Sequence, residues 1–215
     1  VVGALARAGW RVTCLDHAPP DRELPAGVTA IETDLTDAGE TLEATLAADP
    51  DAVVHLAAVG PNYYAPARVY ENNTLAAYHA LTAAGEAGAD VVWTSSESVY
   101  GWVFAEERFP PDALPVSVDH ACRPEDQYGV SKVAAEATAE AVARRYDVPV
   151  TTIRPSWIQH SGAYECNDAG GDDVLINFWS YVDVRDVVRL IEASLESPPD
   201  VAVTPEHAVR HAYTG

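Results

Sequence analysis

The sequence predicts an α/β fold in which a doubly wound parallel sheet carries helices on both faces. Short apolar runs alternate with longer segments of helical periodicity, and this alternation is typical of parallel strands joined by helical crossovers. The 215 residues, 48% of them hydrophobic, are enough for one sizeable core. Because glycine and proline are dispersed and form no linker, we expect a single domain over residues 1–215.

The predicted elements follow one another along the chain. Residues 1–8 have the pattern of the end of a helix closed by Gly9. Strands are expected at 11–15, 28–32, 51–56, 91–94 and 149–154, and helices at 39–47, 75–85 and 127–146. The polar, glycine-rich stretch 159–173 is typical of a mobile loop. Gly3 falls inside the first helix, so we expect the first strand and its glycine-rich loop to precede Val1.

The chain is strongly acidic. Thirty-three Asp and Glu residues against 13 Lys and Arg give a net charge of −20, which repels nucleic-acid phosphates and anionic membranes. Acidity with a single lysine resembles proteins of salt-loving organisms, and an ordinary acidic protein is the alternative. No apolar run is long enough for a membrane span and no signal peptide is visible, so a cytoplasmic location is expected. The three separated cysteines argue against a disulfide framework and a zinc site.

Lys132 is the only lysine, and it follows Tyr128 by four residues. On a helix this spacing places the phenol and the ammonium on one face, where the cation would favour the phenolate and lower a pKa that is ordinarily about 10. Such a tyrosine can act as a general acid or base near neutral pH. An accidental surface pair is the alternative.

Residues directly after the predicted strands are of special interest, because ligands bind at the carboxyl ends of strands in doubly wound sheets. Asp16 closes the strand predicted at 11–15. A carboxylate there can accept hydrogen bonds from an adenosine ribose, which favours NAD over NADP without excluding NADP. The alternative is a turn-forming aspartate before Pro19 and Pro20.

Six motifs follow one another at these strand ends. They are Asp34-Leu35, His55-Leu56-Ala57-Ala58, Asn73, Thr94-Ser95-Ser96-Glu97-Ser98-Val99-Tyr100-Gly101, Tyr128-Gly129-Val130-Ser131-Lys132 and Arg154-Pro155. Together they resemble the ordered motifs of the extended short-chain dehydrogenases/reductases, the NAD-dependent epimerase/dehydratase family. The resemblance extends from Val1 to about Ser197 and implies a Rossmann sheet that binds NAD(P).

The resemblance also implies a role for individual residues. The catalytic set would be Ser96 as a hydrogen-bonding hydroxyl, Tyr128 as the proton-transfer residue and Lys132 as its partner. Cofactor contacts would come from Asp16, Asp34, Leu35, Leu56, Ala57, Ala58, Asn73, Tyr128, Lys132, Pro155 and Ser156. Substrate contacts would come from Ser96, Glu97, Ser98, Tyr128, Trp157 and Gln159, with His160 nearby and Trp157 or Trp179 stacking on a sugar face.

Each assignment has a structural alternative. Ser96 could be a turn hydroxyl, Asn73 a capping or packing amide, and His55 a core histidine. Both tryptophans could be core residues.

The short segment after Lys132 resembles the compact uronate and aldose dehydrogenases of the family, with residues 155–215 forming the substrate side. The resemblance therefore implies an oxidoreductase that acts on a sugar, a sugar acid or a nucleotide sugar, and a homodimer formed through two helices. A nucleotide-sugar epimerase or dehydratase that retains its NAD is one alternative. A non-catalytic dinucleotide-binding sensor is another.

Overall fold

The structure, a computed structural model, describes residues 1–18, 20–21, 23–160, 162, 180–198 and, as backbone only, 209–213. All of the paired strands in this part of the chain are parallel. The larger group has the order β3 (Ala52–His55), β4 (Asp90–Thr94), β5 (Val150–Arg154) and β8 (Val209–Tyr213). Two further pairs join β1 (Val12–Asp16) to β2 (Val28–Glu32) and β6 (Trp157–Gln159) to β7 (Tyr181–Asp183).

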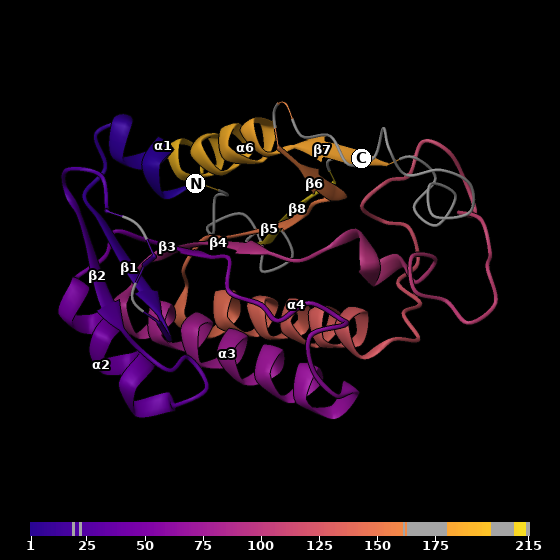
Figure 1. Ribbon diagram of the computed structural model, residues 1–215, viewed down its shortest axis with the longest axis horizontal. Helices are drawn as coiled ribbons and strands as arrows, with labels where there is room; N and C mark the ends of the chain where they lie inside the picture. The colour runs from indigo at the N-terminus through magenta and orange to yellow at the C-terminus, as the bar shows by residue number, and fades with distance from the viewer. Residues whose placement is uncertain (19, 22, 161, 163–179, 199–208, 214–215) are drawn as a thin grey trace.

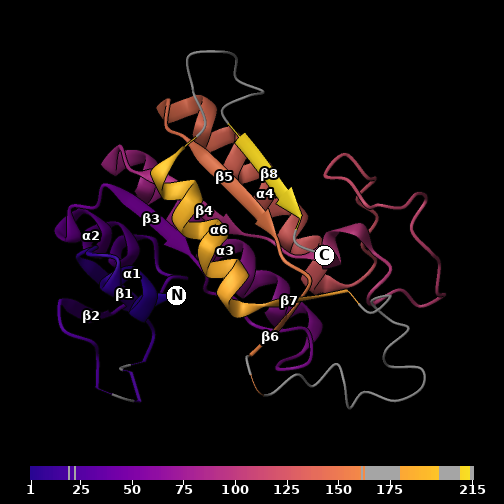
Figure 2. The same cartoon turned by 90° about the horizontal axis from the view of Figure 1, so that it is seen from above.

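Helices cover both faces of these strands, as the alternation predicts (Figure 1). On one face lie α2 (Ala38–Ala48), α3 (Pro66–Ala87) and α4 (Gln127–Tyr146). On the other lie α1 (Val2–Arg7) and α6 (Val184–Glu196), and Figure 2 shows α6 lying over β4 and beside β5. The predicted doubly wound α/β fold is therefore confirmed.

Aspartates begin three of the helices, because their carboxylates accept hydrogen bonds from the free amides of a first helical turn. Asp37 accepts from Gly39 and Glu40 at the start of α2, at 2.8 and 2.9 Å. Asp126 caps α4, and Asp183 caps α6. These caps fix where each helix begins relative to the strand end that precedes it.

Most predicted bounds agree with the structure within one residue, but two predictions differ more. The helix expected at 75–85 begins nine residues earlier, at Pro66, because a proline suits the first helical position and the polar first turns lack the apolar periodicity that signals a helix. The loop expected from Gln159 to 173 begins later, because Gln159 is the last residue of β6. Most of that predicted loop lies outside the described residues.

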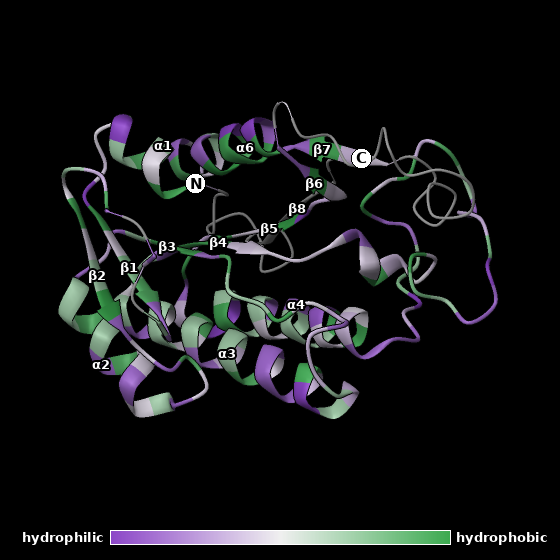
Figure 3. Ribbon diagram, in the orientation of Figure 1, coloured by the Kyte–Doolittle hydropathy of each residue, from purple (hydrophilic) through white to green (hydrophobic). Residues whose placement is uncertain are grey.

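The core lies on both sides of the strands. Alternate residues of β4 face opposite ways: Val91 and Trp93 pack in a cluster with α3 and α4, whereas Val92 packs with Val187 and Ile191 of α6. Figure 3 shows this as hydrophobic colour along the strands, with polar residues on the outer sides of the helices. Among the described helices, none combines the length and the apolar character needed to cross a membrane.

Candidate active site

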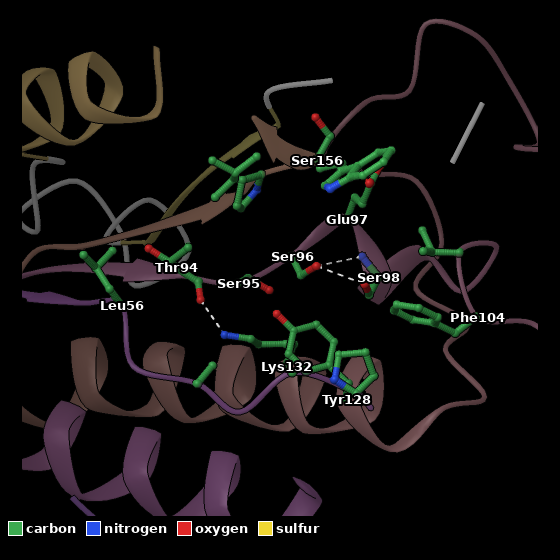
Figure 4. Close-up of a pocket in the computed structure, with 17 residues that line it drawn as sticks. Leu56, Thr94, Ser95, Ser96, Glu97, Ser98, Phe104, Tyr128, Lys132 and Ser156 are labelled. Atoms are coloured by element: carbon green, nitrogen blue, oxygen red, sulfur yellow. Dashed lines mark hydrogen bonds between the residues drawn. The ribbon is translucent and has the colours of Figure 1, made fainter. Parts of the chain in front are cut away.

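A pocket of about 540 Å³ opens where β3, β4 and β5 end (Figure 4). Leu56 directly follows β3, Thr94 ends β4, and Pro155 directly follows β5, and all three line the pocket. Ligands of doubly wound sheets bind at this edge because the loops after the strands gather there. The position of the pocket agrees with the edge at which the motifs were predicted to meet.

Ser96 lies where β4 turns into the short 3₁₀ helix η1 (Glu97–Tyr100). Its Oγ accepts a hydrogen bond from the Ser98 amide at 3.1 Å and donates one to Ser98 Oγ at 3.0 Å. The Ser96 side chain is thus the cap of η1 as well as part of the pocket lining. The turn-hydroxyl interpretation and the catalytic interpretation are therefore compatible at this residue.

Tyr128 lies in the first turn of α4 and turns its hydroxyl toward the end of β4 (Figure 4). The helix start is held by Asp126, whose Oδ1 accepts from the Gly129 amide at 2.8 Å. Burial raises the pKa of the Tyr128 phenol, a hydrogen bond with Ser96 opposes that rise, and the negative charge of Asp126 adds to it. Ser96 is accordingly the group that favours the phenolate.

Lys132 lies one helical turn after Tyr128 on α4 and is buried, with 5% of the residue exposed. Its Nζ donates to the Thr94 carbonyl at 2.8 Å and lies 5.6 Å from the centre of the Tyr128 ring and 5.1 Å from that of Trp93. Burial lowers the pKa of Lys132 to about 8, and the charge of Glu136 acts in the opposite direction. The spacing of four does place phenol and ammonium on one face of α4.

The expected lowering of the Tyr128 pKa by Lys132 is not found. In this structure the pKa of Tyr128 is raised, because desolvation is its largest influence. The Lys132 ammonium meanwhile donates to the Thr94 carbonyl, at the end of the neighbouring strand.

A buried ion pair lies behind this site, and sequence reasoning did not identify it. Arg154, at the end of β5, donates from Nε and Nη2 to the two carboxylate oxygens of Glu136 at 2.8 and 2.7 Å. Ser95 Oγ donates to the same carboxylate at 2.7 Å. The sequence did contain one sign of Glu136: it follows Lys132 by four residues, just as Lys132 follows Tyr128, so all three share one side of a helix.

Asn73 of α3 holds the loop after β3 without lining the pocket. Its Oδ1 accepts from the Val59 amide at 2.7 Å and its Nδ2 donates to the Val59 carbonyl at 3.0 Å. A longer contact of 3.4 Å joins Nδ2 to Ser131 Oγ on α4. The amide therefore fixes the segment that carries Leu56 and Ala58 into the pocket.

Three predicted cofactor residues lie at the ends of β1 and β2, outside the pocket. The exposed Asp16 carboxylate is 2.9 Å from His17 Nδ1. Asp34 accepts from the amide and hydroxyl of Thr36 at 2.9 and 2.7 Å, and these bonds hold the pKa of Asp34 below its ordinary value. The Leu35 carbonyl is 3.1 Å from His79 Nδ1. Their adenosine contacts stay predictions.

Ten of the predicted site residues line the pocket: Leu56, Ala58, Ser96, Glu97, Ser98, Tyr128, Lys132, Pro155, Ser156 and Trp157. Gln159 is buried at the end of β6 and is not among the lining residues, nor is Ala57. His160 is exposed, and Trp179 lies outside the described residues. Sequence reasoning gave no role to the lining residues Gly60, Pro61, Thr94, Ser95, Val103, Phe104 and Ile158.

His55 ends β3 and is buried, with 5% exposed. Burial, aided by the charge of Lys132, lowers its pKa to about 3, so the imidazole is neutral at physiological pH. Over the part of the chain that the structure describes, no group of three or more His, Cys, Asp or Glu side chains could hold a metal ion.

Comparison with known proteins identifies the family. Residues 1–177 match the NAD dependent epimerase/dehydratase family. The chain is 33% identical over 171 residues to the L-arabinose 1-dehydrogenase (NAD(P)(+)) of Haloferax volcanii, which covers 74% of this chain and 66% of that protein. The chain therefore belongs to the NAD-dependent epimerase/dehydratase family.

Solved structures share the fold. The Bordetella bronchiseptica enzyme WbmG, in complex with NAD and UDP, is 25% identical with a TM-score of 0.61, over 73% of this chain and 48% of that one. A mutated uronate dehydrogenase is 23% identical with a TM-score of 0.69, over 98% of this chain and 70% of that one. The present chain thus spans about half the length of WbmG and about two thirds of the arabinose dehydrogenase.

Proposed function

We propose that this family member is an NAD(P)-dependent oxidoreductase that oxidises a carbinol carbon of a sugar, a sugar acid or a nucleotide sugar. The observation that carries the proposal is the convergence of Ser96, Tyr128 and Lys132 on one pocket at the carboxyl edge of the sheet. Similarity to the arabinose dehydrogenase supports a dehydrogenase, and NAD in the WbmG structure supports the cofactor class. Oxidation requires a proton acceptor, which Tyr128 of the pocket could provide, and a hydride acceptor, which only a bound cofactor would supply.

The described residues fit a dinucleotide. An ammonium has three donors, and Lys132 uses one of them on the Thr94 carbonyl, so the others can donate to ribose hydroxyls. Thr94 Oγ1 is buried at the pocket and has no hydrogen-bond partner in the described part of the chain. A bound nicotinamide would supply the acceptor for the hydride.

The side chains of the pocket would handle the substrate hydroxyl. Ser96 Oγ would hold the substrate oxygen by a hydrogen bond, and the Tyr128 phenolate would accept the proton as the hydride leaves the same carbinol. Lys132 would stabilise that phenolate once its ammonium turns toward the phenol. Trp157 and Phe104, both lining the pocket, provide apolar surface against which a sugar ring could pack.

Replacing Tyr128 by Phe tests the proposal. Without the phenolic oxygen, NADH formation should fall by about 10²–10⁴-fold, while NAD binding measured by calorimetry should change little. The assay follows NADH absorbance over a panel of aldoses, uronates and UDP-sugars. Tyr70→Phe, on the exposed surface of α3, is the matched control. Full activity in Tyr128→Phe would refute the proposed proton transfer.

A sugar epimerase or dehydratase that retains its NAD is the second candidate, supported by epimerases among the structural neighbours. Substrate conversion without net NADH formation would favour this candidate. Net NADH formation with free sugars would favour the dehydrogenase. A preparation that binds NAD but converts no sugar of the panel would point to the non-catalytic sensor.

A further inference from the structure

Three side chains of α4 face the strands in consecutive turns. Tyr128, Lys132 and Glu136 follow one another at a spacing of four, which places them along one side of the helix. Tyr128 and Lys132 line the pocket, whereas Glu136 lies one turn further from it and is 6% exposed. A buried carboxylate in this position, behind a buried ammonium, calls for a physical explanation because isolated buried charges are costly.

The Glu136 carboxylate is held in place from two strands. Ser95 Oγ of the β4 end and Arg154 Nε both donate to Oε1, and Arg154 Nη2 donates to Oε2. Arg154 is itself fixed through Nη1, which donates to the Val118 carbonyl at 2.8 Å and to the Tyr100 hydroxyl at 3.3 Å. The carboxylate therefore has little freedom to reorient.

This network also reaches Ser95, the residue directly before the proposed catalytic hydroxyl. Ser95 directly precedes Ser96 and directly follows Thr94, whose carbonyl accepts the hydrogen bond of Lys132. The same carboxylate thus ties the helix that carries Lys132 to the strand end that carries Ser96.

We infer that Glu136 is a positioning residue for Lys132: its buried carboxylate, one helical turn behind the lysine and held by Ser95 and Arg154, keeps the lysine charged at the pocket and fixes α4 against the end of β4. Burial opposes the charged lysine, and the nearby negative charge offsets that cost. The importance of this role for turnover rests on the proposed function. The charge on Lys132 can be measured without substrate or cofactor.

Several charged or titratable groups surround Lys132. His55 approaches from β3 and is neutral at physiological pH, and Tyr128 and Glu136 lie on α4 itself. Arg154 stands behind Glu136 on β5, and Glu97 of η1 lines the same pocket. Of these groups, Glu136 is the one whose negative charge raises the pKa of Lys132.

The single lysine allows a direct test. Protein labelled with ¹³C at lysine Cε gives one lysine signal, whose pH titration reports the pKa of Lys132 alone. In Glu136→Gln we expect that pKa to fall by ~1 unit, because the favourable charge is lost while the shape of the side chain is kept. Glu140→Gln is the control, since Glu140 pairs with Arg144 at 3.5 Å on the exposed side of α4 and should leave the titration unchanged.

A double variant covers the case in which Glu136→Gln does not fold. Glu136→Leu with Arg154→Met removes both buried charges, an exchange that buried ion pairs often tolerate. It should still lower the pKa of Lys132, but by less than Glu136→Gln does, because Glu136 acts on Lys132 more strongly than Arg154 and the loss of the Arg154 charge opposes the fall. An unchanged or raised pKa in whichever variant folds would overturn the inference.

Turnover provides the catalytic arm of the test. If a charged Lys132 is required, the alkaline limb of the kcat/KM profile should move to lower pH in Glu136→Gln, whereas a merely structural defect would lower activity at every pH. If the pKa of Lys132 falls in Glu136→Gln but Tyr128→Phe is fully active, the proposed function is refuted and the effect of Glu136 on the charge of Lys132 stands. If the pKa of Lys132 is unchanged in Glu136→Gln and Tyr128→Phe is inactive, only the role of Glu136 is refuted.

Discussion

Asn73→Ala tests how the loop after β3 is held. The Asn73 amide makes two hydrogen bonds to the backbone of Val59, at 2.7 and 3.0 Å, and both are lost in the variant. A buried backbone group that loses its partner costs ~1–3 kcal/mol. Val59 is partly exposed, so water can replace part of this loss, and we expect the free energy of unfolding to fall by about 3 kcal/mol.

The assay is urea unfolding, supported by thermal unfolding. For a chain of this size, a loss of about 3 kcal/mol corresponds to a fall in Tm of ~6–12 °C. Asn72→Ala is the matched control, because it makes the same change at the adjacent position of α3, where the amide does not hold this loop. A loss of less than ~1 kcal/mol in Asn73→Ala, or an equal loss in Asn72→Ala, would refute the conclusion that Asn73 holds the loop after β3.

Three further outcomes are expected. The pKa of His55 lies near 3, below its ordinary 6.5, so the contribution of the neutral imidazole to the free energy of unfolding is complete above pH 6.5. It is lost as the pH falls toward 3, by up to ~1.4 kcal/mol per pH unit, so the difference between the urea midpoints at pH 7 and pH 5 should be smaller in His55→Leu. Gly129→Ala places a Cβ 2.7 Å from the Ser98 carbonyl and should cost ~1–3 kcal/mol and reduce turnover, unlike Gly39→Ala in α2. Finally, Tm should rise from ~0.1 to ~2 M KCl if the −20 charge is an adaptation to salt, and a flat response would argue against that.

Much of the fold could be predicted because its signals are local. The strand at 28–32 and the helix at 127–146 have the predicted bounds, since apolar runs and helical periodicity mark them directly. The start of α3 at Pro66 was not predicted, because its first turns are polar and show no such periodicity.

The candidate site was predictable only in part. The spacing of four predicted that Tyr128 and Lys132 share one face of a helix, and the resemblance to the family implied that Ser96 lies with them at one edge of the sheet. Phe104 and Val103 line the same pocket, but they come from a long segment after η1 in which no pattern indicates where a side chain lies. The catalytic roles themselves stay predictions.

By itself, the sequence determined the α/β class, the strand ends at which chemistry is expected, and the single lysine placed one turn after a tyrosine. Only the tertiary structure decided the electrostatics: the pKa of Tyr128 is raised, that of Lys132 lies near 8, and Glu136 is paired with Arg154. The reason is physical. Periodicity and spacing are properties of neighbouring residues, whereas desolvation and ion pairing depend on side chains that packing brings together from distant parts of the chain.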